Sequence, residues 1–384
     1  MKKDMAINIF KVSVGIFLAF AIVEVTLRFL GFPSINTNTF DKNNLVIFKP
    51  NQKFLSKDRC YNSILRINDV GFHSRTYSVE KPQGTFRVVI IGDSFVEAVQ
   101  VPLEKTFPAI LEKKLNQNAK NVKYEVISIA KSGNGTLMNL MYAREYAMKL
   151  DPDLLINAFT ANDLEDDFTA DKTLHAVSIG DIYNPDSFYL SPPTSGSRYA
   201  LFLKHFLLER SLLFEKWWRN AVVIKSQFNK KMDLTVRGDE FQIDTFIEAQ
   251  MEPQSKLAKS MWVKEKKALN TFNQFAESHQ VRFILVHLAE VYLVDKEELI
   301  SRYHLSPEQA LALNSDMVRQ KLTDISLEGN FPFFSTESFL LDNYKNTKSL
   351  PVFSCDNHYN ELGHELTTEA IYGFLTDSSV KILK

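Results

Sequence analysis

Four consecutive β-branched apolar residues, Val88-Val89-Ile90-Ile91, run directly into Gly92-Asp93-Ser94. A short stretch that is apolar at every position is typical of a strand buried on both faces, as in a parallel sheet. Ligands of open parallel sheets bind just beyond the carboxyl ends of the strands, and this pattern places Ser94 there. Gly, Asp and Ser are also ordinary turn residues, so the tripeptide alone is equally compatible with a structural turn.

From Arg87 onward, predicted strands alternate with predicted helices. We expect strands at 88–92, 124–129, 154–160, 283–288 and 331–334, and helices at 108–118, 136–150, 259–279, 307–327 and 362–375. Alternating strands and helices connect by right-handed crossovers, which give a parallel sheet covered by helices on both faces. The sequence therefore predicts an α/β fold.

Composition divides the chain into three regions. Residues 1–31 are predominantly apolar, residues 32–82 are rich in Asn and turn residues, and residues 83–384 carry the alternating pattern. We expect an N-terminal transmembrane helix, then an irregular neck and strap, then the main domain.

The alternation stops between about 166 and 256, which indicates an insert in the main domain. Within it, the aromatic stretch from Tyr199 to Trp218 predicts a helix with one bulky face. Such a face either packs on the main domain or forms a lid or sugar-stacking surface beside a site.

The N-terminus has the features of a membrane segment. Positive charges at Lys2, Lys3 and Lys11 precede or flank an apolar run from Val12 to Val23. A helix over Met5–Leu30 would be long enough to cross a bilayer at about 1.5 Å per residue. We expect an uncleaved signal anchor with a cytoplasmic N-terminus and an extracytoplasmic main domain. The alternatives are a cleaved signal peptide and a buried helix of a soluble protein.

Charge and cysteine content give no indication of nucleic-acid binding or of metal binding. The 384 residues carry a formal net charge of -1, which gives no indication of a nucleic-acid partner. Cys60 and Cys355 lie outside any CxxC or Cys/His cluster, so we expect no metal site. In an oxidising compartment the two thiols would form a disulfide, and otherwise they would remain separate and buried.

Ser94 and a pair of residues far from it in the sequence, Asp356 and His358, could perform serine-based ester chemistry. Asp356 and His358 are two positions apart, so in an extended segment their side chains point the same way. Asp356 would then orient the imidazole of His358, and His358 would take the proton of Ser94, the candidate nucleophile.

Two further loops supply donors for an oxyanion hole. Gly133 follows the second expected strand and Asn162 follows the third, so both lie on the same sheet edge as Ser94. The backbone N–H groups of Ser94 and Gly133 and the side-chain amide of Asn162 would together bind a developing oxyanion.

Gly92-Asp93-Ser94-Phe95, Gly133, Asn162-Asp163 and Asp356-x-His358 resemble, in this order, the four sequence blocks of the SGNH (GDSL) hydrolase superfamily. The resemblance implies a flavodoxin-like three-layer α/β/α fold with a central parallel sheet. It also implies Ser94 as nucleophile, Asp356 and His358 as the rest of the triad, and Ser94, Gly133 and Asn162 as the oxyanion hole. The anchor and the lead-in before Val88 resemble membrane-anchored bacterial members that accompany exopolysaccharide assembly.

The sequence departs from the family pattern at two positions. Ala98 and Thr160 stand where many members have Gly, and the large insert is not part of the minimal fold. The α/β-hydrolase elbow G-x-S-x-G is a poorer match, because Val96 occupies its last position.

Four other polar residues near these motifs have simpler interpretations. Asp93 and Asp163 are expected to brace their loops. His364 is expected to be structural, and His287 to line the active edge.

The resulting hypothesis is an extracytoplasmic esterase that needs no cofactor and removes O-acyl groups, of the acetyl type, from a glycan or other ester substrate. An O-acyltransferase would use the same residues on a polysaccharide. A non-catalytic anchored scaffold, in contact with polysaccharide assembly proteins, is the third alternative.

Overall fold

The computed structural model describes residues 2–29, 37–173, 177–179, 183–184, 189–191, 207, 211, 213–214, 245–290, 297, 300–301, 305–378 and 382–383. Contacts group the chain into two compact units, one of residues 1–38 with 192–242 and the other of residues 39–191 with 243–384. Each is described by itself.

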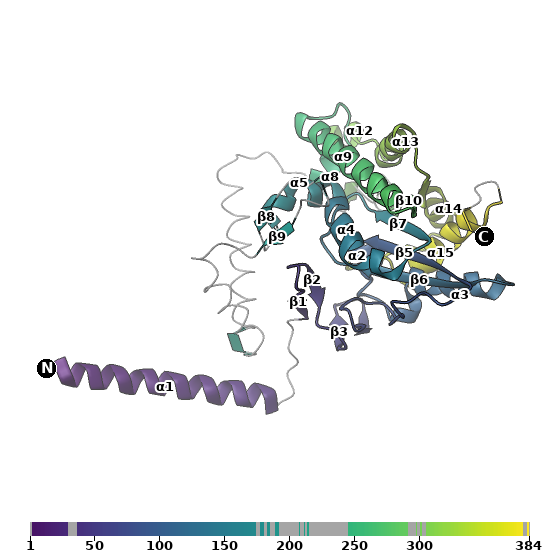
Figure 1. Ribbon diagram of the computed structural model, residues 1–384. Helices are drawn as coiled ribbons and strands as arrows, with labels where there is room; N and C mark the ends of the chain where they lie inside the picture. The colour runs from purple at the N-terminus through teal and green to yellow at the C-terminus, as the bar shows by residue number, and fades with distance from the viewer. Residues whose placement is uncertain are drawn as a thin grey trace. The chain divides into compact units, whose positions relative to one another are not determined.

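The larger unit is built on a five-stranded sheet (Figure 1). Its strands are β5 (Thr85–Gly92), β6 (Lys123–Ala130), β7 (Leu154–Phe159), β10 (Arg282–His287) and β11 (Phe333–Ser335). All neighbouring strands pair in parallel, in the order β11-β10-β7-β5-β6. Numbered along the chain, this is the flavodoxin-like order 2-1-3-4-5. The predicted α/β fold with a central parallel sheet is therefore confirmed.

Alternate residues of the strands serve two separate cores. Val89 and Ile91 of β5 pack in one cluster and Val88 and Ile90 in the other, because successive side chains point to opposite faces. The first cluster is closed by helices α4 (Thr136–Tyr142), α9 (Lys256–Ser278) and α13 (Met317–Gly329). The second is closed by α3 (Phe107–Asn118), α14 (Glu337–Thr347) and α15 (Glu361–Thr376). Burial on both faces explains why the strands are apolar throughout.

The expected helix at 307–327 is wrong as a single element. The structure has two helices, α12 (Pro307–Ala312) and α13, separated by an extended turn. Leu313 forms an antiparallel bridge with Met251, and the Asn314 N–H donates to the Gln250 carbonyl at 2.9 Å. This pairing with a distant segment interrupts the helix.

The neck is more regular than expected. Two strand pairs lie within it, β1 (Asn38–Phe40) with β2 (Val46–Phe48), and β3 (Lys53–Lys57) with β4 (Asn62–Arg66), the second of which is antiparallel. Other elements of the described residues include helices α2 (Ser94–Glu97), α5 (Asp163–Thr173) and α8 (Thr245–Glu248), 3₁₀-helices at Leu103–Lys105 and Met148–Leu150, a π-helix at Ala143–Ala147, and the antiparallel strands β8 (Val177–Ile179) and β9 (Tyr189–Ser191). The aromatic helix expected at 199–218 lies almost wholly outside the described residues.

The smaller unit contains helix α1 (Lys2–Phe29). Where Glu24 of this helix meets the insert, its carboxylate accepts hydrogen bonds from Ser211 Oγ at 3.0 Å and from the Leu213 N–H at 3.1 Å. Within the part of the chain that the structure describes, no helix is both long enough and apolar enough to cross a membrane. The membrane anchor at residues 1–31 stays a prediction.

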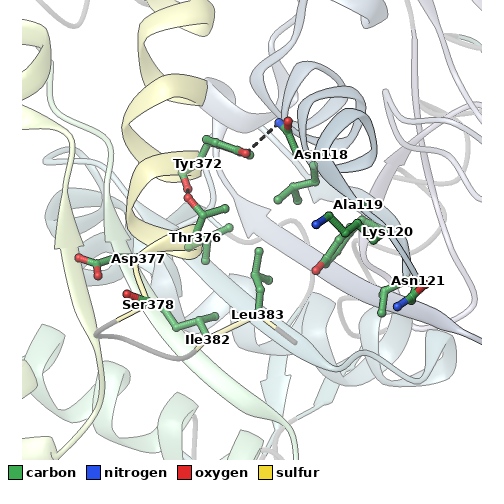
Figure 2. A pocket seen from close by; sticks show the side chains of 14 residues that line it. Asn118, Ala119, Lys120, Asn121, Tyr372, Thr376, Asp377, Ser378, Ile382 and Leu383 are labelled. Atoms are coloured by element: carbon green, nitrogen blue, oxygen red, sulfur yellow. Dashed lines mark hydrogen bonds between the residues drawn. The ribbon is translucent and has the colours of Figure 1, made fainter.

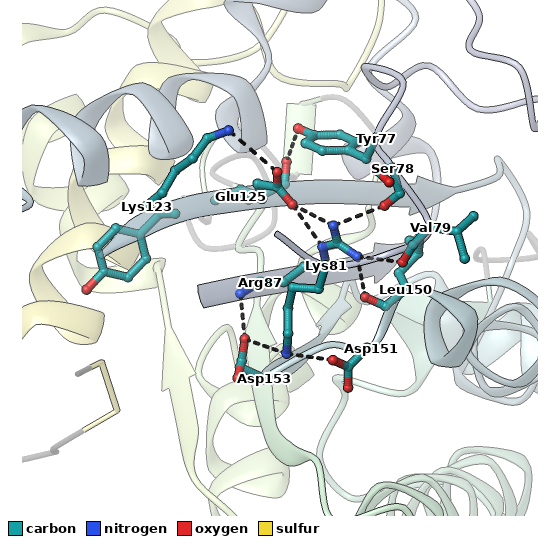
Figure 3. A network of polar contacts seen from close by, with 12 residues as sticks. Tyr77, Ser78, Val79, Lys81, Arg87, Lys123, Glu125, Leu150, Asp151 and Asp153 are labelled. Carbon is teal, nitrogen blue, oxygen red and sulfur yellow. Dashed lines mark hydrogen bonds and ion pairs between the residues drawn. The ribbon is translucent and has the colours of Figure 1, made fainter. Parts of the chain in front are cut away.

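A buried arginine holds the amino-terminal edge of the sheet together (Figure 3). Arg87 of β5 donates to Glu125 of β6 from Nε at 2.9 Å and from Nη2 at 2.7 Å. The same guanidinium donates to the carbonyls of Ser78 at 3.0 Å, Val79 at 3.2 Å and Leu150. One side chain therefore joins the strap, two strands and the end of a helix.

We predict that Arg87→Met lowers the free energy of unfolding by about 3–5 kcal/mol, because it removes the buried partner of the Glu125 carboxylate and leaves only the exposed Lys123 near it. Urea denaturation measures the change. Lys123→Met is the matched control: its Nζ lies 3.8 Å from Glu125 but its side chain is 66% exposed, so its loss should cost at most about 1 kcal/mol. Equal effects of the two substitutions would contradict this account.

Candidate active site

The turn that carries Ser94 forms where β5 ends. Asp93 caps the short helix α2, with its Oδ1 accepting from the Phe95 N–H at 2.9 Å, and Ser94 is the first residue of that helix. Gly92 has no room for a side chain, since a Cβ there would collide with Val96 and lie 3.1 Å from the Ala158 carbonyl oxygen. The turn therefore presents Ser94 at the carboxyl edge of the sheet.

The structure brings Ser94, His358 and Asp356 into one chain of hydrogen bonds. Ser94 Oγ lies 2.7 Å from His358 Nε2. On the other side of the ring, His358 Nδ1 makes a short hydrogen bond to Asp356 Oδ1. A carboxylate accepts hydrogen bonds, so Nδ1 carries the proton and Nε2 is left with a lone pair facing the serine hydroxyl.

Two contacts fix the loop that carries Asp356. Gln100 Nε2 donates to Asp356 Oδ2 at 3.0 Å, so the oxygen not used by His358 is also engaged. Next to it, Cys355 forms a disulfide with Cys60, which follows β3. Of the two alternatives left by the sequence, the disulfide is the one observed. It ties the neck to the catalytic loop.

Opposing influences act on His358. Burial lowers the pKa of its imidazole, but the hydrogen bond and negative charge of Asp356 outweigh burial and raise the pKa above 6.5. The charges of Asp93 and Glu290 act in the same direction. The imidazolium is thus stabilised, as a general base requires once it has accepted a proton.

This raised pKa predicts the pH dependence of any reaction that uses His358 as a base. An imidazolium cannot accept the Ser94 proton, so the rate should fall as pH drops through the His358 pKa, with its midpoint above 6.5. Asp356→Asn removes the charge that raises the pKa, so it should shift the midpoint to lower pH while retaining part of the activity. The profile of kcat/KM from about pH 5 to 9 measures both effects. An unshifted midpoint in Asp356→Asn would contradict the assignment.

Two backbone donors of the expected oxyanion hole are available. Lys131-Ser132-Gly133-Asn134 forms a turn in which the Asn134 N–H donates to the Lys131 carbonyl at 3.2 Å, and Gly133 has φ of +79°. A positive φ at this position favours glycine. Within the described part of the chain, the N–H groups of Gly133 and Ser94 have no hydrogen-bond partner.

Asn162 is positioned differently from the sequence-based expectation of a free donor. Its Nδ2 lies 3.2 Å from Asp93 Oδ2 and 3.2 Å from Asp166 Oδ2, so both amide hydrogens are engaged by carboxylates. Burial and the charge of Asp93 raise the pKa of Asp166 to about 7. Binding an oxyanion would require Asn162 to release one of these two partners.

Thr160, which replaces the glycine of the family pattern, bridges two buried acids. Its Oγ1 lies 2.9 Å from Asp93 Oδ2 and 3.0 Å from Asp163 Oδ1. The Thr160 hydroxyl has one proton and can donate to only one of the two carboxyl groups, so the other contact needs a donor of its own. Burial and the charge of Asp93 raise the pKa of Asp163 well above its usual range. A protonated Asp163 would donate to Thr160, and Thr160 would donate to Asp93, so both acids brace the site.

Ala98, the other departure, keeps the backbone that glycine would adopt. It ends α2 with φ of 51° and ψ of 48°, the left-handed region, and its N–H donates to the Ser94 carbonyl at 2.9 Å. The turn is therefore preserved, at the steric cost that a Cβ imposes there.

The two other histidines that the sequence placed near these motifs, His287 and His364, lie outside this hydrogen-bond chain. His287 Nδ1 lies 2.9 Å from Ser335 Oγ, and burial, assisted by the charge of Arg319, lowers its pKa to about 3. His364 Nδ1 accepts from the Phe107 N–H at 3.3 Å, and burial lowers its pKa to about 3. Both are neutral packing residues, so the expectation that His287 lines the active edge finds no support in its contacts.

Sequence reasoning missed Gln100, Asp166 and Glu290. Glu290 is buried and follows β10, so the rule that strand ends carry functional groups could have indicated it. Nothing in the local pattern around Gln100 or Asp166 indicates their partners.

A pocket of about 600 Å³ lies apart from this site (Figure 2). It is formed by the ends of α3 and α15 and by the start of β6, and includes Asn118, whose amide donates to the Tyr372 hydroxyl at 2.9 Å. These are the amino ends of the strands, the opposite edge from Ser94.

Comparisons with known proteins give fold-level similarity only. No protein-family model matches the chain, and no curated protein matches it. Three similar solved structures each have a TM-score of 0.40. TesA is 11% identical, and the match covers 76% of this chain and 98% of TesA. LAE5, an alpha/beta hydrolase enzyme from the metagenome of Lake Arreo, Spain, is 13% identical, with 78% of this chain and 97% of LAE5 covered, and Axe2, an acetylxylan esterase from Geobacillus stearothermophilus, is 12% identical, with 78% of this chain and 96% of Axe2 covered. Similarity this weak carries no argument about function, which rests on the site itself.

Proposed function

We propose that this protein is a serine esterase of the SGNH type that cleaves acyl esters through an acyl-enzyme on Ser94. The observation that carries the proposal is the continuous hydrogen-bond chain from Ser94 Oγ through His358 to Asp356. A hydroxyl becomes a useful nucleophile at neutral pH only with a base aimed at its proton, and this chain supplies one.

In the first half-reaction, Ser94 Oγ bonds to the ester carbonyl carbon while its proton passes to His358 Nε2. The carbonyl oxygen becomes an oxyanion, which the N–H groups of Ser94 and Gly133 and the amide of Asn162 would stabilise. His358 then gives the proton to the departing alcohol as the C–O bond breaks.

In the second half-reaction, water loses a proton to His358 and attacks the acyl carbon. Collapse of the second tetrahedral intermediate breaks the bond to Ser94 Oγ, which regains the proton from His358. The products are a carboxylic acid and free enzyme.

The proposal also covers the cellular location of the protein and its substrate. A Cys60–Cys355 disulfide suits an oxidising compartment, which agrees with a main domain outside the cytoplasm. We propose an O-acetylated glycan as substrate, residues 1–31 as a membrane anchor, and polysaccharide assembly proteins as neighbours.

The triad is tested by substitution. We predict that Ser94→Ala and His358→Ala each abolish hydrolysis of nitrophenyl acetate, and that the double variant is no worse than either, because the residues act as a unit. Asn162→Ala should lower kcat by about 10²–10³ with little change in KM, as expected for loss of one oxyanion donor. Steady-state kinetics measure all four variants.

Ser349→Ala is the matched control, since Ser349 is exposed and not part of the triad. Full activity in Ser94→Ala would overturn the proposal, as would an inert wild-type protein. Product analysis with an acetylated donor, with and without a glycan acceptor, distinguishes transfer to a sugar hydroxyl from transfer to water.

The anchor is tested by fractionation. Large apolar side chains of α1 are exposed, among them Phe17 at 72% and Phe29 at 90%. We predict that the full chain sediments with membranes and resists salt and alkaline washing, whereas a variant lacking residues 1–30 is soluble and active. Full-length protein that remains soluble without detergent would refute the anchor but not the esterase.

A further inference from the structure

We infer that Glu97 is a positioning residue of the active site, which acts through Ser132 to hold Gly133 at a fixed distance from Ser94. The inference rests on the proposed esterase function, because it concerns the two backbone donors of the oxyanion hole. These donors come from different segments, so their separation depends on whatever joins the segments.

Glu97 joins them directly. It belongs to α2, three residues after Ser94, and is 2% exposed. Its Oε2 accepts a short hydrogen bond from Ser132 Oγ, and its Oε1 pairs with Lys131 Nζ. The nucleophile helix is thereby tied to the residue that precedes Gly133.

Contacts hold both the backbone of Glu97 and the partner of its side chain in place. Its backbone carbonyl accepts from His73 Nδ1 at 2.9 Å, and burial lowers the pKa of His73, which keeps that imidazole neutral. Lys131 is buried as well, and its Nζ lies 4.1 Å from the centroid of the Phe48 ring. A buried carboxylate with a cation on one oxygen and a hydroxyl on the other has few alternative positions.

The other hydrogen bonds and ion pair of this turn engage its end residues, Lys131 and Asn134, so the Ser132 side chain provides the contact nearest to Gly133. Ser132 and Gly133 are exposed, and no atom lies within 4 Å of the position that a Gly133 Cβ would occupy. Oxyanion donors act only when they lie about 2.7–3.1 Å from the oxygen they stabilise. The Ser132–Glu97 hydrogen bond therefore determines how well the Gly133 N–H meets the transition state.

Ser132→Ala is the informative variant, because it removes the hydroxyl while leaving the Glu97–Lys131 pair intact. We expect kcat for nitrophenyl acetate to fall about 10–100-fold with KM nearly unchanged, as for a catalytic group displaced by about 1 Å. Affinity for a trifluoromethyl ketone, which forms a tetrahedral adduct with Ser94, should fall by a similar factor. Ser132→Thr, which keeps the hydroxyl, should restore most of both.

If Ser132 had only a structural role, Ser132→Ala would lower the urea concentration at the unfolding midpoint. The affinity of the folded protein for the ketone would then be unchanged. Ser349→Ala controls for the loss of a surface hydroxyl. If the wild-type protein hydrolyses the ester and binds the ketone, and Ser132→Ala does both equally well, the positioning role is wrong and the esterase stands. If the wild-type protein does neither, the esterase proposal fails and this inference fails with it.

Discussion

Parallel pairing of β5 with a strand on each side is the constraint on which the rest of the structure depends. Gly92 is in register with Ala130 of β6 and with Ala158 of β7. All three strands therefore end at the same level, and the loops that follow them begin side by side. Ser94, Gly133 and Asn162 are close because of this register, although they are far apart in the sequence.

Buried charged groups at the two edges of this sheet are accommodated in different ways. At the amino edge, Arg87 neutralises Glu125 and satisfies three carbonyls. At the carboxyl edge, acids gather with few cations, and burial raises the pKa values of Asp163 and Glu265. The Glu97–Lys131 ion pair accommodates buried charge at this edge, and the raised pKa values of the other acids reduce the negative charge that remains.

The sequence was sufficient to predict the strands, their parallel pairing and the three residues, Ser94, Asp356 and His358, that the structure joins in one hydrogen-bond chain, because each has a local signature. Apolar runs mark buried strands, and Asp356-x-His358 places two side chains on one side of an extended segment. The contacts of Gln100 and of Leu313 were not predictable. Gln100 contacts Asp356, which is 256 positions away, and Leu313 pairs with Met251. The sequence next to Gln100 or Leu313 has no periodic pattern that would indicate these distant partners. The sequence allowed either a Cys60–Cys355 disulfide or two separate thiols, and it could not decide between them because only the folded chain brings the two sulfurs together.

That crosslink also sets an order of events during biosynthesis. Cys60 is made 295 residues before Cys355, which at ordinary elongation rates is an interval of about 15–60 s. Throughout this time the first cysteine has no native partner. Asp356 and His358 adjoin the second cysteine, so these two side chains and the crosslink can reach their native positions only after synthesis has passed Cys355.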